Sequence, residues 1–412
     1  MTRSTTRSTV FLTGTMLAAA LIAWPVAAQT GQAAETREAN APDQQPAFDG
    51  QTRAAEPAEK PQIAVEVVAE GLPHVWAMEF LPDGRMLVTT KEGAMHIVSN
   101  DDGEAGAAIE GVPEVMSDGQ GGLLDVALAP DFETTGSIYF SFSEPREGGN
   151  GTSVASARLV EEGDTASLQD VSVIFRQMPT YDGDKHFGSR LVFGREGELY
   201  VTVGERSDRE TRVGAQDLGS GFGKVFRIDA EGKALSGNPF ANEDGALPEI
   251  WSYGHRNLQS AALDGDGRLW TVEHGPKGGD ELNRPEAGKN YGWPEVTYGI
   301  EYSGGPVGEG LTAKDGTEQP VYYWDPVIGP SGMAFYDGDA IPEWKGAFLV
   351  GGLVTQGLVV LHMDGDRVAN EERVPLDARI RDVKVAPDGT VYAVTEQRGG
   401  GESTILRLMR AS

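Results

Sequence analysis

From Gln62 onward the chain repeats one hydrophobic pattern: an alternating apolar and polar segment, a turn rich in Pro, Asp and Gly, and a second alternating segment. In the clearest copy the turn is Pro82-Asp83-Gly84. Alternation with a period of two gives a strand one apolar face, and two such strands joined by an Asp-Gly turn predict a β-hairpin. Six copies are present, at residues 77–88, 124–142, 191–203, 261–272, 332–350 and 383–394.

The spacing of these hairpins predicts the architecture. Their turns lie roughly 50 to 75 residues apart, which is typical of four-stranded propeller blades with loop insertions. We therefore predict an all-β fold, a six-bladed β-propeller whose four-stranded antiparallel blades surround a central channel. The alternating segment 64–68 has no hairpin partner, so we expect it to close the ring by pairing with residues 405–408. A stack of two β-sandwiches is the alternative architecture.

Composition fits a turn-rich β protein and excludes some chemistry. The chain of 412 residues holds 55 glycines and 23 prolines and shows no long helical periodicity. It has no cysteine, which excludes a thiol nucleophile and any cysteine-ligated zinc. Stability must therefore come from the core or from bound metal rather than from disulfides.

The start of the chain has the pattern of a secretory signal peptide. Arg3 and Arg7 precede an apolar run over residues 10–26, and small residues close it at Ala28. We predict residues 1–28 to be a leader cleaved near Ala28, and the mature protein to be periplasmic. A membrane anchor is the weaker alternative, because polar residues interrupt the run and it is short for a full span.

Residues 29–60 are rich in Ala, Gln, Glu, Pro and Thr and have almost no large apolar side chain. Such a segment cannot bury enough surface to fold, so we predict a disordered linker there and one propeller domain over residues 61–412. No later segment is long and apolar enough to span a bilayer, so we expect no stable membrane insertion.

The formal charge of the chain is −29, from 63 acidic and 34 basic residues. Removal of a leader that holds two arginines and no acid would bring it to about −31. Such a charge argues against nucleic acid as a partner and favours cations and neutral substrates. A monomer and a homodimer both remain open.

Loops that would converge on the channel carry residues unusual for simple connections. His186 precedes the first strand of the third hairpin and Glu205 follows its second strand, so the hairpin brings them to the same end. A His beside a carboxylate is a general base with an orienting partner. The plainer interpretation is a surface His near a solvated Glu.

Other loops offer groups that bind anions. Gln120 provides an amide in a glycine-rich loop, and Arg256 and Asn257 follow a strand, where a guanidinium fork suits carboxylate or quinone oxygens. Arg379 and Arg381 alternate along one strand and so share a face, which would attract a polyanion if it faced the channel. A plain turn, an arginine that bridges blades, and a solvent-facing strand are the respective alternatives.

The segment after the fourth hairpin is a candidate calcium site. Gly275 and Pro276 tend to turn their carbonyl oxygens outward, and Asp280 and Glu281 follow. Hard cations such as calcium bind carbonyl and carboxylate oxygens, although the spacing is not that of an EF-hand. The chain has no Gly-x-Ser-x-Gly elbow, phosphate-binding P-loop or dinucleotide fingerprint, so a nicotinamide enzyme is not expected.

Taken together, these segments resemble the soluble pyrroloquinoline quinone (PQQ) dependent sugar dehydrogenases, in particular the aldose sugar dehydrogenase branch of the glucose/sorbosone dehydrogenase family. The resemblance runs from about Gly71 to Leu408, and it is specific because several short segments occur in the same order. These segments are residues 118–124, 186–191, 254–257, 274–283, 290–294 and 379–383.

The resemblance implies roles for the site residues. His186 would take the proton from the anomeric C1 hydroxyl of an aldose while hydride passes to PQQ, giving a lactone, and Glu205 would orient it. Arg256 and Asn257 would contact the quinone oxygens, where negative charge grows. The resemblance also implies that Gln120, Arg379 and Arg381 contact the cofactor's carboxylates and edge. The carbonyls of Gly275 and Pro276 would bind a calcium ion that polarises the quinone. Glu281 and the backbone of Tyr291 would bind a second, structural calcium.

Two positions depart from the glucose-specific branch, which resembles this chain but has Asp in place of Glu205 and a Lys near Thr355. The second departure argues against an enzyme restricted to glucose. The electron acceptor is unknown. The alternatives are a calcium-dependent propeller sugar lactonase, whose metal would be held by Glu, Asn and Asp side chains, and a non-catalytic ligand-binding propeller, in which His186 and Glu205 would lie apart.

Overall fold

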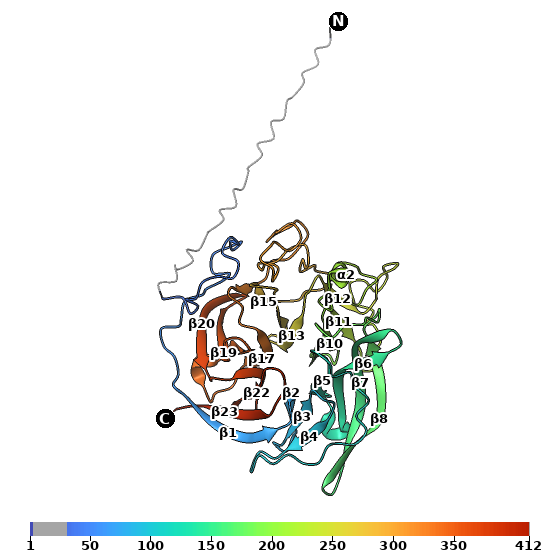
Figure 1. Cartoon of the computed structure of the whole chain (residues 1–412). Coiled ribbons are helices and arrows are strands. Elements are labelled where there is room, and N and C mark those ends of the chain that lie inside the picture. Colours follow the sequence, from blue (N-terminus) through green and yellow to red (C-terminus); the bar gives the residue numbers. More distant parts are fainter. Residues whose placement is uncertain (3–30, 412) are drawn as a thin grey trace. The chain divides into compact units, whose positions relative to one another are not determined.

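Six antiparallel β-sheets surround a common centre (Figure 1). The structure is a computed structural model that describes residues 1–2 and 31–411. The six-bladed propeller is therefore confirmed, and each of the six predicted hairpins forms one strand pair of a different blade. The predicted signal peptide falls almost wholly outside the described residues.

The blades follow one another along the chain. Their strands are β2 (Val75–Phe80), β3 (Met86–Thr90) and β4 (Met95–Val98); β5 (Leu123–Leu128), β6 (Ser137–Arg146), β7 (Gly149–Glu162) and β8 (Thr165–Arg176); β9 (Gly188–Phe193), β10 (Leu199–Val203), β11 (Lys224–Ile228) and β12 (Ile250–Tyr253); β13 (Leu258–Leu263), β14 (Leu269–Glu273), β15 (Asp280–Asn283) and β16 (Tyr322–Trp324); β17 (Pro330–Tyr336), β18 (Ala347–Gly352), β19 (Gly357–Asp364) and β20 (Arg367–Pro375); and β21 (Arg379–Val385), β22 (Val391–Glu396) and β23 (Ser403–Arg410), completed by β1 (Ile63–Leu72).

The helical parts of the described chain are single turns: α1 (Phe132–Thr135), α2 (Arg209–Arg212) and two 3₁₀ turns at Val213–Ala215 and Pro342–Trp344. None of these described helices is long and apolar enough to cross a membrane.

The last blade closes the ring as predicted. Strand β1 pairs antiparallel with β23 from Ile63 opposite Arg410 to Leu72 opposite Ser403, so the two ends of the propeller domain share one sheet. The first blade differs from the prediction, because its sheet has three strands instead of four. In place of a fourth strand, residues 104–109 run irregularly along β4 and bond to it at separate points, such as the N–H of Ile109 to the carbonyl of Met95 at 2.9 Å.

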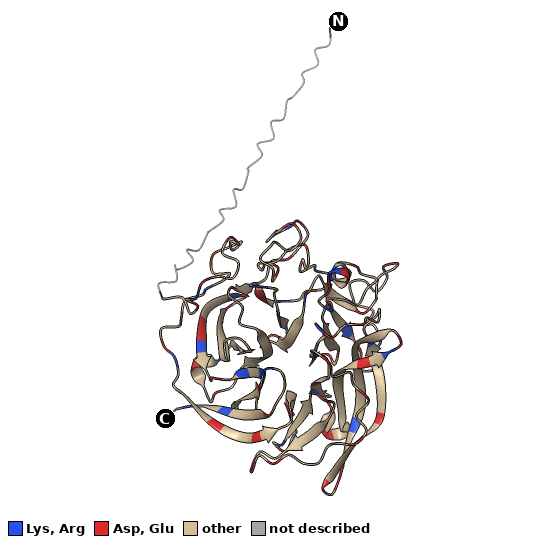
Figure 2. Cartoon of the chain, in the orientation of Figure 1, with Lys and Arg blue, Asp and Glu red and all other residues tan. Residues whose placement is uncertain are grey.

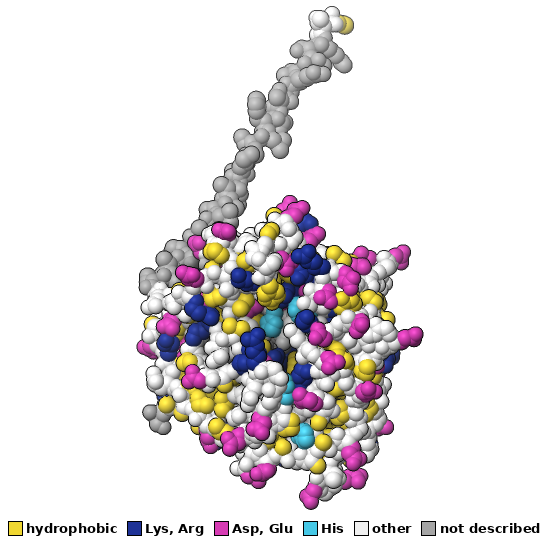
Figure 3. All heavy atoms as spheres, viewed as in Figure 1, with side chains coloured by type: hydrophobic (Ala, Val, Ile, Leu, Met, Phe, Trp, Pro, Cys, Tyr) yellow, Lys and Arg dark blue, Asp and Glu magenta, His cyan; other side chains and the backbone are white. Residues whose placement is uncertain are grey.

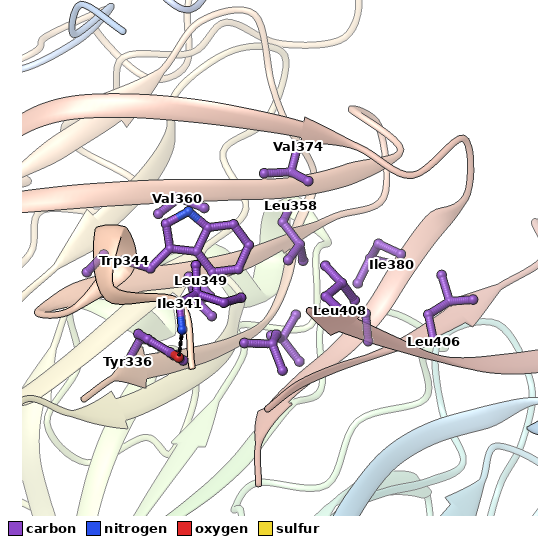
Figure 4. Close-up of a cluster of buried hydrophobic side chains, with 14 residues drawn as sticks. Tyr336, Ile341, Trp344, Leu349, Leu358, Val360, Val374, Ile380, Leu406 and Leu408 are labelled. Carbon is purple, nitrogen blue, oxygen red and sulfur yellow. Dashed lines mark hydrogen bonds between the residues drawn. The ribbon is translucent and has the colours of Figure 1, made fainter. Parts of the chain in front are cut away.

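Apolar side chains pack between neighbouring blades rather than in one central core. Figure 4 shows the cluster between the fifth and sixth blades, where Trp344, Leu349 and Val360 lie near Ile380 and Leu408. Burying one such side chain contributes about 1.5–3 kcal/mol. Each blade is therefore held mainly by its neighbours, which leaves the central channel free for polar groups.

The inner strands of the six blades line that channel. Residues of β2, β5, β9, β13, β17 and β21 all border a cavity of about 440 Å³ at one of its mouths. The loops that lead into these strands meet at the other mouth. Because they come from every blade, residues far apart in sequence are brought together there.

Residues 31–60 do not form the disordered linker that their composition predicted. Residues 31–56 fold back on themselves, since Ala33 bridges Ala55, and they pack on the fourth and fifth blades. Gln51 and Ala54 are fully buried there, and the N–H of Ala54 donates to the Tyr322 hydroxyl at 2.8 Å. Backbone and amide hydrogen bonds hold this segment where apolar burial alone would not.

Candidate active site

The second mouth of the channel opens into a cavity of about 720 Å³. Acidic residues are spread over the chain as a whole (Figure 2), whereas Lys, Arg and His side chains gather around the centre of the face seen in Figure 3. The cavity itself is bordered by four basic side chains, Lys91, Arg379, Arg381 and Arg398, and by four acidic ones, Glu92, Asp118, Asp280 and Glu396. The charges at the cavity wall are therefore mixed, and an anionic ligand is favoured where Arg379 and Arg381 lie together.

His186 and Glu205 form a buried pair beside this cavity. The third blade places them together as predicted, because Gly188 of β9 lies opposite Val203 of β10. Nδ1 of His186 is 3.2 Å from Oε2 of Glu205, and both side chains are buried. A carboxylate can only accept, so Nδ1–H donates to it and Nε2 is left without a proton, which is the form of a general base.

The environment keeps the pair in that state. Burial lowers the pKa of His186, the positive charge of Arg256 lowers it further, and Glu205 opposes both effects. Burial alone would raise the pKa of Glu205, but the contacts with His186 and the charge of Arg256 bring it below its usual value. Near neutral pH the site therefore holds a neutral imidazole and a carboxylate.

Backbone strain is concentrated around this pair. His186, Ser189, Arg206 and Ser207 all have positive φ, between 50° and 100°. Such conformations are costly for residues other than glycine and persist where the surroundings fix them, often at functional sites. Gln120 is one of the fixing groups, because its Oε1 accepts the His186 N–H at 2.9 Å.

Arg256 and Asn257 lie on the next blade, just before β13. Nη1 of Arg256 donates to the carbonyls of His274 at 2.9 Å and Gly275 at 2.7 Å, and its guanidinium lies 5.1 Å from the Trp293 ring. Asn257 accepts the N–H of Gly188 at 3.2 Å, which ties it to the strand that follows His186. The buried Nε of Arg256 and Nδ2 of Asn257 have no partner among the described residues, so both can still donate.

Arg379 and Arg381 share a face of β21, as predicted, and both border the cavity. Both pair with a single carboxylate, that of Glu396, with nitrogen–oxygen distances of 2.5 Å. Burial would raise the pKa of Glu396, but the two arginines hold it below the usual value. Two cations share one anion, so a positive charge remains for a ligand.

Gly275 and Pro276 also border the cavity. A side chain at Gly275 would overlap the carbonyls of Gly278 and Gly279, so the loop is tight enough to require glycine at this position. The N–H of Gly275 donates to Asp280 Oδ1 at 2.9 Å, and its carbonyl accepts from Arg256.

Glu281 and Tyr291 lie away from this cavity, in a second, much smaller one that also touches Gly275. Its volume of about 10 Å³ gives room for one water molecule or ion. Burial and the nearby Glu273 raise the pKa of Glu281 well above its usual value. Within the described residues no group of three or more His, Cys, Asp or Glu side chains forms a metal cluster.

Several residues of the site were missed by the sequence analysis. Trp76, Gln259 and Glu396 all border the cavity, and Gln259 Oε1 accepts from Arg381 at 3.2 Å. Arg206 stacks 4.0 Å from the Phe187 ring and donates to the carbonyl of Lys185, which holds the loop before His186. The position of Glu396, at the end of a predicted strand opposite Arg379, was the one available signal.

Comparison with known proteins gives these residues a context. The family model for "Glucose / Sorbosone dehydrogenase" matches residues 72–407. The chain belongs to the glucose/sorbosone dehydrogenase family. This agrees with the resemblance drawn from the sequence segments, and it covers all six blades.

Several proteins similar to this chain are named sugar dehydrogenases. The aldose sugar dehydrogenase YliI of Escherichia coli (strain K12) is 44% identical over 344 residues, which are 82% of this chain and 91% of that protein. The apo-form crystal structure of the soluble aldose sugar dehydrogenase from Escherichia coli superposes with a TM-score of 0.79 at 42% identity, covering 85% of this chain and all of that one. The PQQ-bound aldose sugar dehydrogenase from Streptomyces coelicolor gives 0.69 at 30% identity, covering 86% and 99%.

Proposed function

We propose that this member of the glucose/sorbosone dehydrogenase family is a PQQ-dependent aldose sugar dehydrogenase that works in the periplasm. It oxidises the anomeric C1 hydroxyl of aldoses to lactones and passes the electrons to an acceptor that is not identified. The observation that carries the proposal is the buried His186–Glu205 pair beside a cavity that Arg379 and Arg381 border.

The cavity suits PQQ, a planar quinone with three carboxylates. Arg379 and Arg381 share one carboxylate and so can accept the negative charge of a ligand. The unpartnered Nε of Arg256 and Nδ2 of Asn257 are donors suited to quinone oxygens. Bound there, PQQ would supply the hydride acceptor, and calcium held by the carbonyls of Gly275 and Pro276 would polarise it.

The chain's own residues supply the proton chemistry. Nε2 of His186, free of a proton, takes the proton of the anomeric hydroxyl, and Glu205 stabilises the imidazolium that results. Arg256 adds positive charge where negative charge develops. Gln120 keeps the base in place through the His186 N–H.

The small cavity at Glu281 suits a second, structural calcium. Glu273 and Glu281 are two buried carboxylates joined through the amide of Asn283, at 2.9 and 3.0 Å. A cation next to Glu281, coordinated in addition by the Tyr291 backbone, would remove the repulsion that raises its pKa.

The two alternative functions fit less well. A sugar lactonase would hold its metal with Glu, Asn and Asp side chains in the channel, whereas at this cavity Asp280 is bound by backbone N–H groups and Glu396 by two arginines. A non-catalytic propeller was expected to keep His186 and Glu205 apart, and they are hydrogen-bonded.

The test is turnover by the reconstituted protein. The chain from Gln29, loaded with calcium and PQQ, should reduce a dye with glucose, galactose, xylose or maltose as the substrate, and should lose this activity without PQQ. His186→Ala should lower kcat about 10²–10⁴-fold, because it removes the base, while PQQ binding remains.

A matched control is available in the same chain. His362 lies 3.3 Å from Glu372 on the fifth blade, outside the cavity, so His362→Ala removes an equivalent His–Glu pair. It should leave turnover within about twofold of the parent. Equal activity in the His186 and His362 variants would show that the base lies elsewhere, and absence of PQQ binding would reject the dehydrogenase.

A further inference from the structure

Residues 31–60, called the strap below, reach the wall of the cavity of about 720 Å³, in which the sugar is proposed to bind and which is called the sugar cavity. They precede the part of the chain that matches the family model, which starts at residue 72. The strap crosses the outside of the fourth and fifth blades. Its inner end meets the loop 325–329, which connects β16 to β17 and contributes Val327 and Gly329 to the cavity.

Four hydrogen bonds join the strap to this loop. The N–H groups of Asn40 and Ala41 donate to the two carboxylate oxygens of Asp325 at 2.5 and 2.9 Å. Arg53 donates to the Asp325 carbonyl at 2.7 Å, and Oδ1 of Asn40 accepts the N–H of Val327 at 3.2 Å. Asn40 therefore contacts the backbone of a cavity residue directly.

The inner side of the same loop is held by Asp280. Its Oδ2 accepts the N–H groups of Ile328 at 2.9 Å and Gly329 at 2.8 Å, and its Oδ1 accepts the N–H of Gly275 at 2.9 Å. The loop is thus clamped between the strap on one side and a buried carboxylate on the other. That carboxylate also positions the glycine whose carbonyl faces Arg256.

The strap has separate anchors that make it a firm support. The fully buried amide of Gln51 donates to the Pro320 carbonyl at 3.0 Å and accepts from the Tyr298 hydroxyl at 3.0 Å. Further along, Asn370 of β20 donates to the carbonyl of Ala55 at 3.1 Å. These contacts lie away from the cavity and hold the strap in place independently of Asn40.

We propose that the strap is a positioning element of the sugar cavity and that Asn40 is the residue through which it acts. Asn40 fixes Asp325 and Val327, and with them the room left for the sugar beside Gly275. The part that concerns the sugar rests on the proposed dehydrogenase function, whereas the mechanical coupling does not.

The coupling is tested by amide hydrogen exchange of the apo protein in two variants. Asn40→Ala removes one side-chain hydrogen bond between the strap and the propeller, at the cavity wall, and Asn370→Ala removes two, to the carbonyls of Ala55 and Glu56, away from that wall. Asn40→Ala should speed exchange of the Ile328 and Gly329 amides about fivefold or more, although neither bonds to Asn40, and Asn370→Ala should change it less than about twofold. Faster exchange at Val327 alone, or equal exchange in both variants, would overturn the proposal.

Kinetics of the reconstituted enzyme give the second measurement. Asn40→Ala should raise the KM for aldoses about three- to tenfold with kcat within about twofold, because the wall is loosened while the base is untouched. Asn370→Ala should leave both unchanged. An unchanged KM in Asn40→Ala rejects the role in sugar binding. If the parent has no turnover, the dehydrogenase proposal fails, and the exchange data still decide the coupling.

Discussion

Two buried arginines near the central channel, Arg190 and Arg256, are each only 4% exposed but have different partners. Arg190 pairs with two carboxylates from other blades, Asp125 at 2.7 Å and Asp382 at 3.1 Å. Arg256 donates to two backbone carbonyls and faces an aromatic ring, and it forms no ion pair with a described carboxylate.

The different partners of the two arginines indicate different roles, a structural one for Arg190 and a ligand-binding one for Arg256. Charge on Arg190 is already balanced, so this arginine joins the second, third and sixth blades and has little left to offer a ligand. Arg256 forms no ion pair with a described side chain, although its charge helps to lower the pKa of Glu205, and a buried charge of this kind interacts strongly with negative charge that arrives or develops. This difference supports the role proposed for Arg256 at the quinone and gives Arg190 a structural role.

The largest expected effects come from replacing each of the two arginines in turn. Arg190→Met leaves Asp125 and Asp382 buried without their cation and should lower the free energy of unfolding by about 3–5 kcal/mol. Arg256→Met strands no carboxylate and should cost about 1 kcal/mol, but it should lower kcat about 10²–10³-fold. Urea unfolding and dye reduction measure the two quantities. Equal destabilisation by both substitutions would contradict the comparison.

Calcium binding tests the corresponding case for negative charge, which is Glu281, a buried carboxylate whose charge is poorly compensated. At a calcium concentration 100 times Kd the free energy of unfolding should rise by about 2.7 kcal/mol, seen as a higher Tm in metal-stripped protein. Glu281→Gln should remove most of that rise. The exposed Glu286, which pairs with Arg284, provides the control Glu286→Gln, and an equal calcium response in both variants would place the ion elsewhere.

Arg379 and Arg381 lie between the two extremes, because they share the carboxylate of Glu396. Replacing either by Gln should weaken PQQ binding about tenfold, or about 1.4 kcal/mol, through loss of one charge-assisted contact. Titration of the apo protein followed by absorbance measures this effect, which should shrink as salt is added. Arg410→Gln, on an exposed arginine paired with Glu343, should bind PQQ like the parent; a similar loss there would reject a specific contact.

The smallest effect concerns the pH dependence of the base. Because burial and Arg256 lower the pKa of His186, the fall of kcat/KM on the acid side should lie at a lower pH than for an ordinary histidine. Glu205 raises that pKa, so Glu205→Gln should move the acid limb to lower pH still. An acid limb that moves upward, or does not move, would mean that Glu205 does not set the charge of the base.

The sequence was sufficient where the causes are local. A turn such as Pro82-Asp83-Gly84 and its flanking alternation define a hairpin without reference to the rest of the chain, and the register of one hairpin places His186 beside Glu205. The strap could not be foreseen, because Gln51 is satisfied by Tyr298 and Pro320, more than 200 positions away. Composition measures apolar surface and does not detect hydrogen bonds of this kind.

Closure of the propeller by β1 and β23 also sets an order of events during synthesis. Glu66 and Arg407, which form an ion pair across these strands, are 341 residues apart in the sequence. The first strand must therefore wait, unpaired, until nearly the whole chain has emerged. The channel mouth that gathers His186, Arg256 and Arg381 is complete only at that moment, so the proposed cofactor would find its full site only at the end of folding.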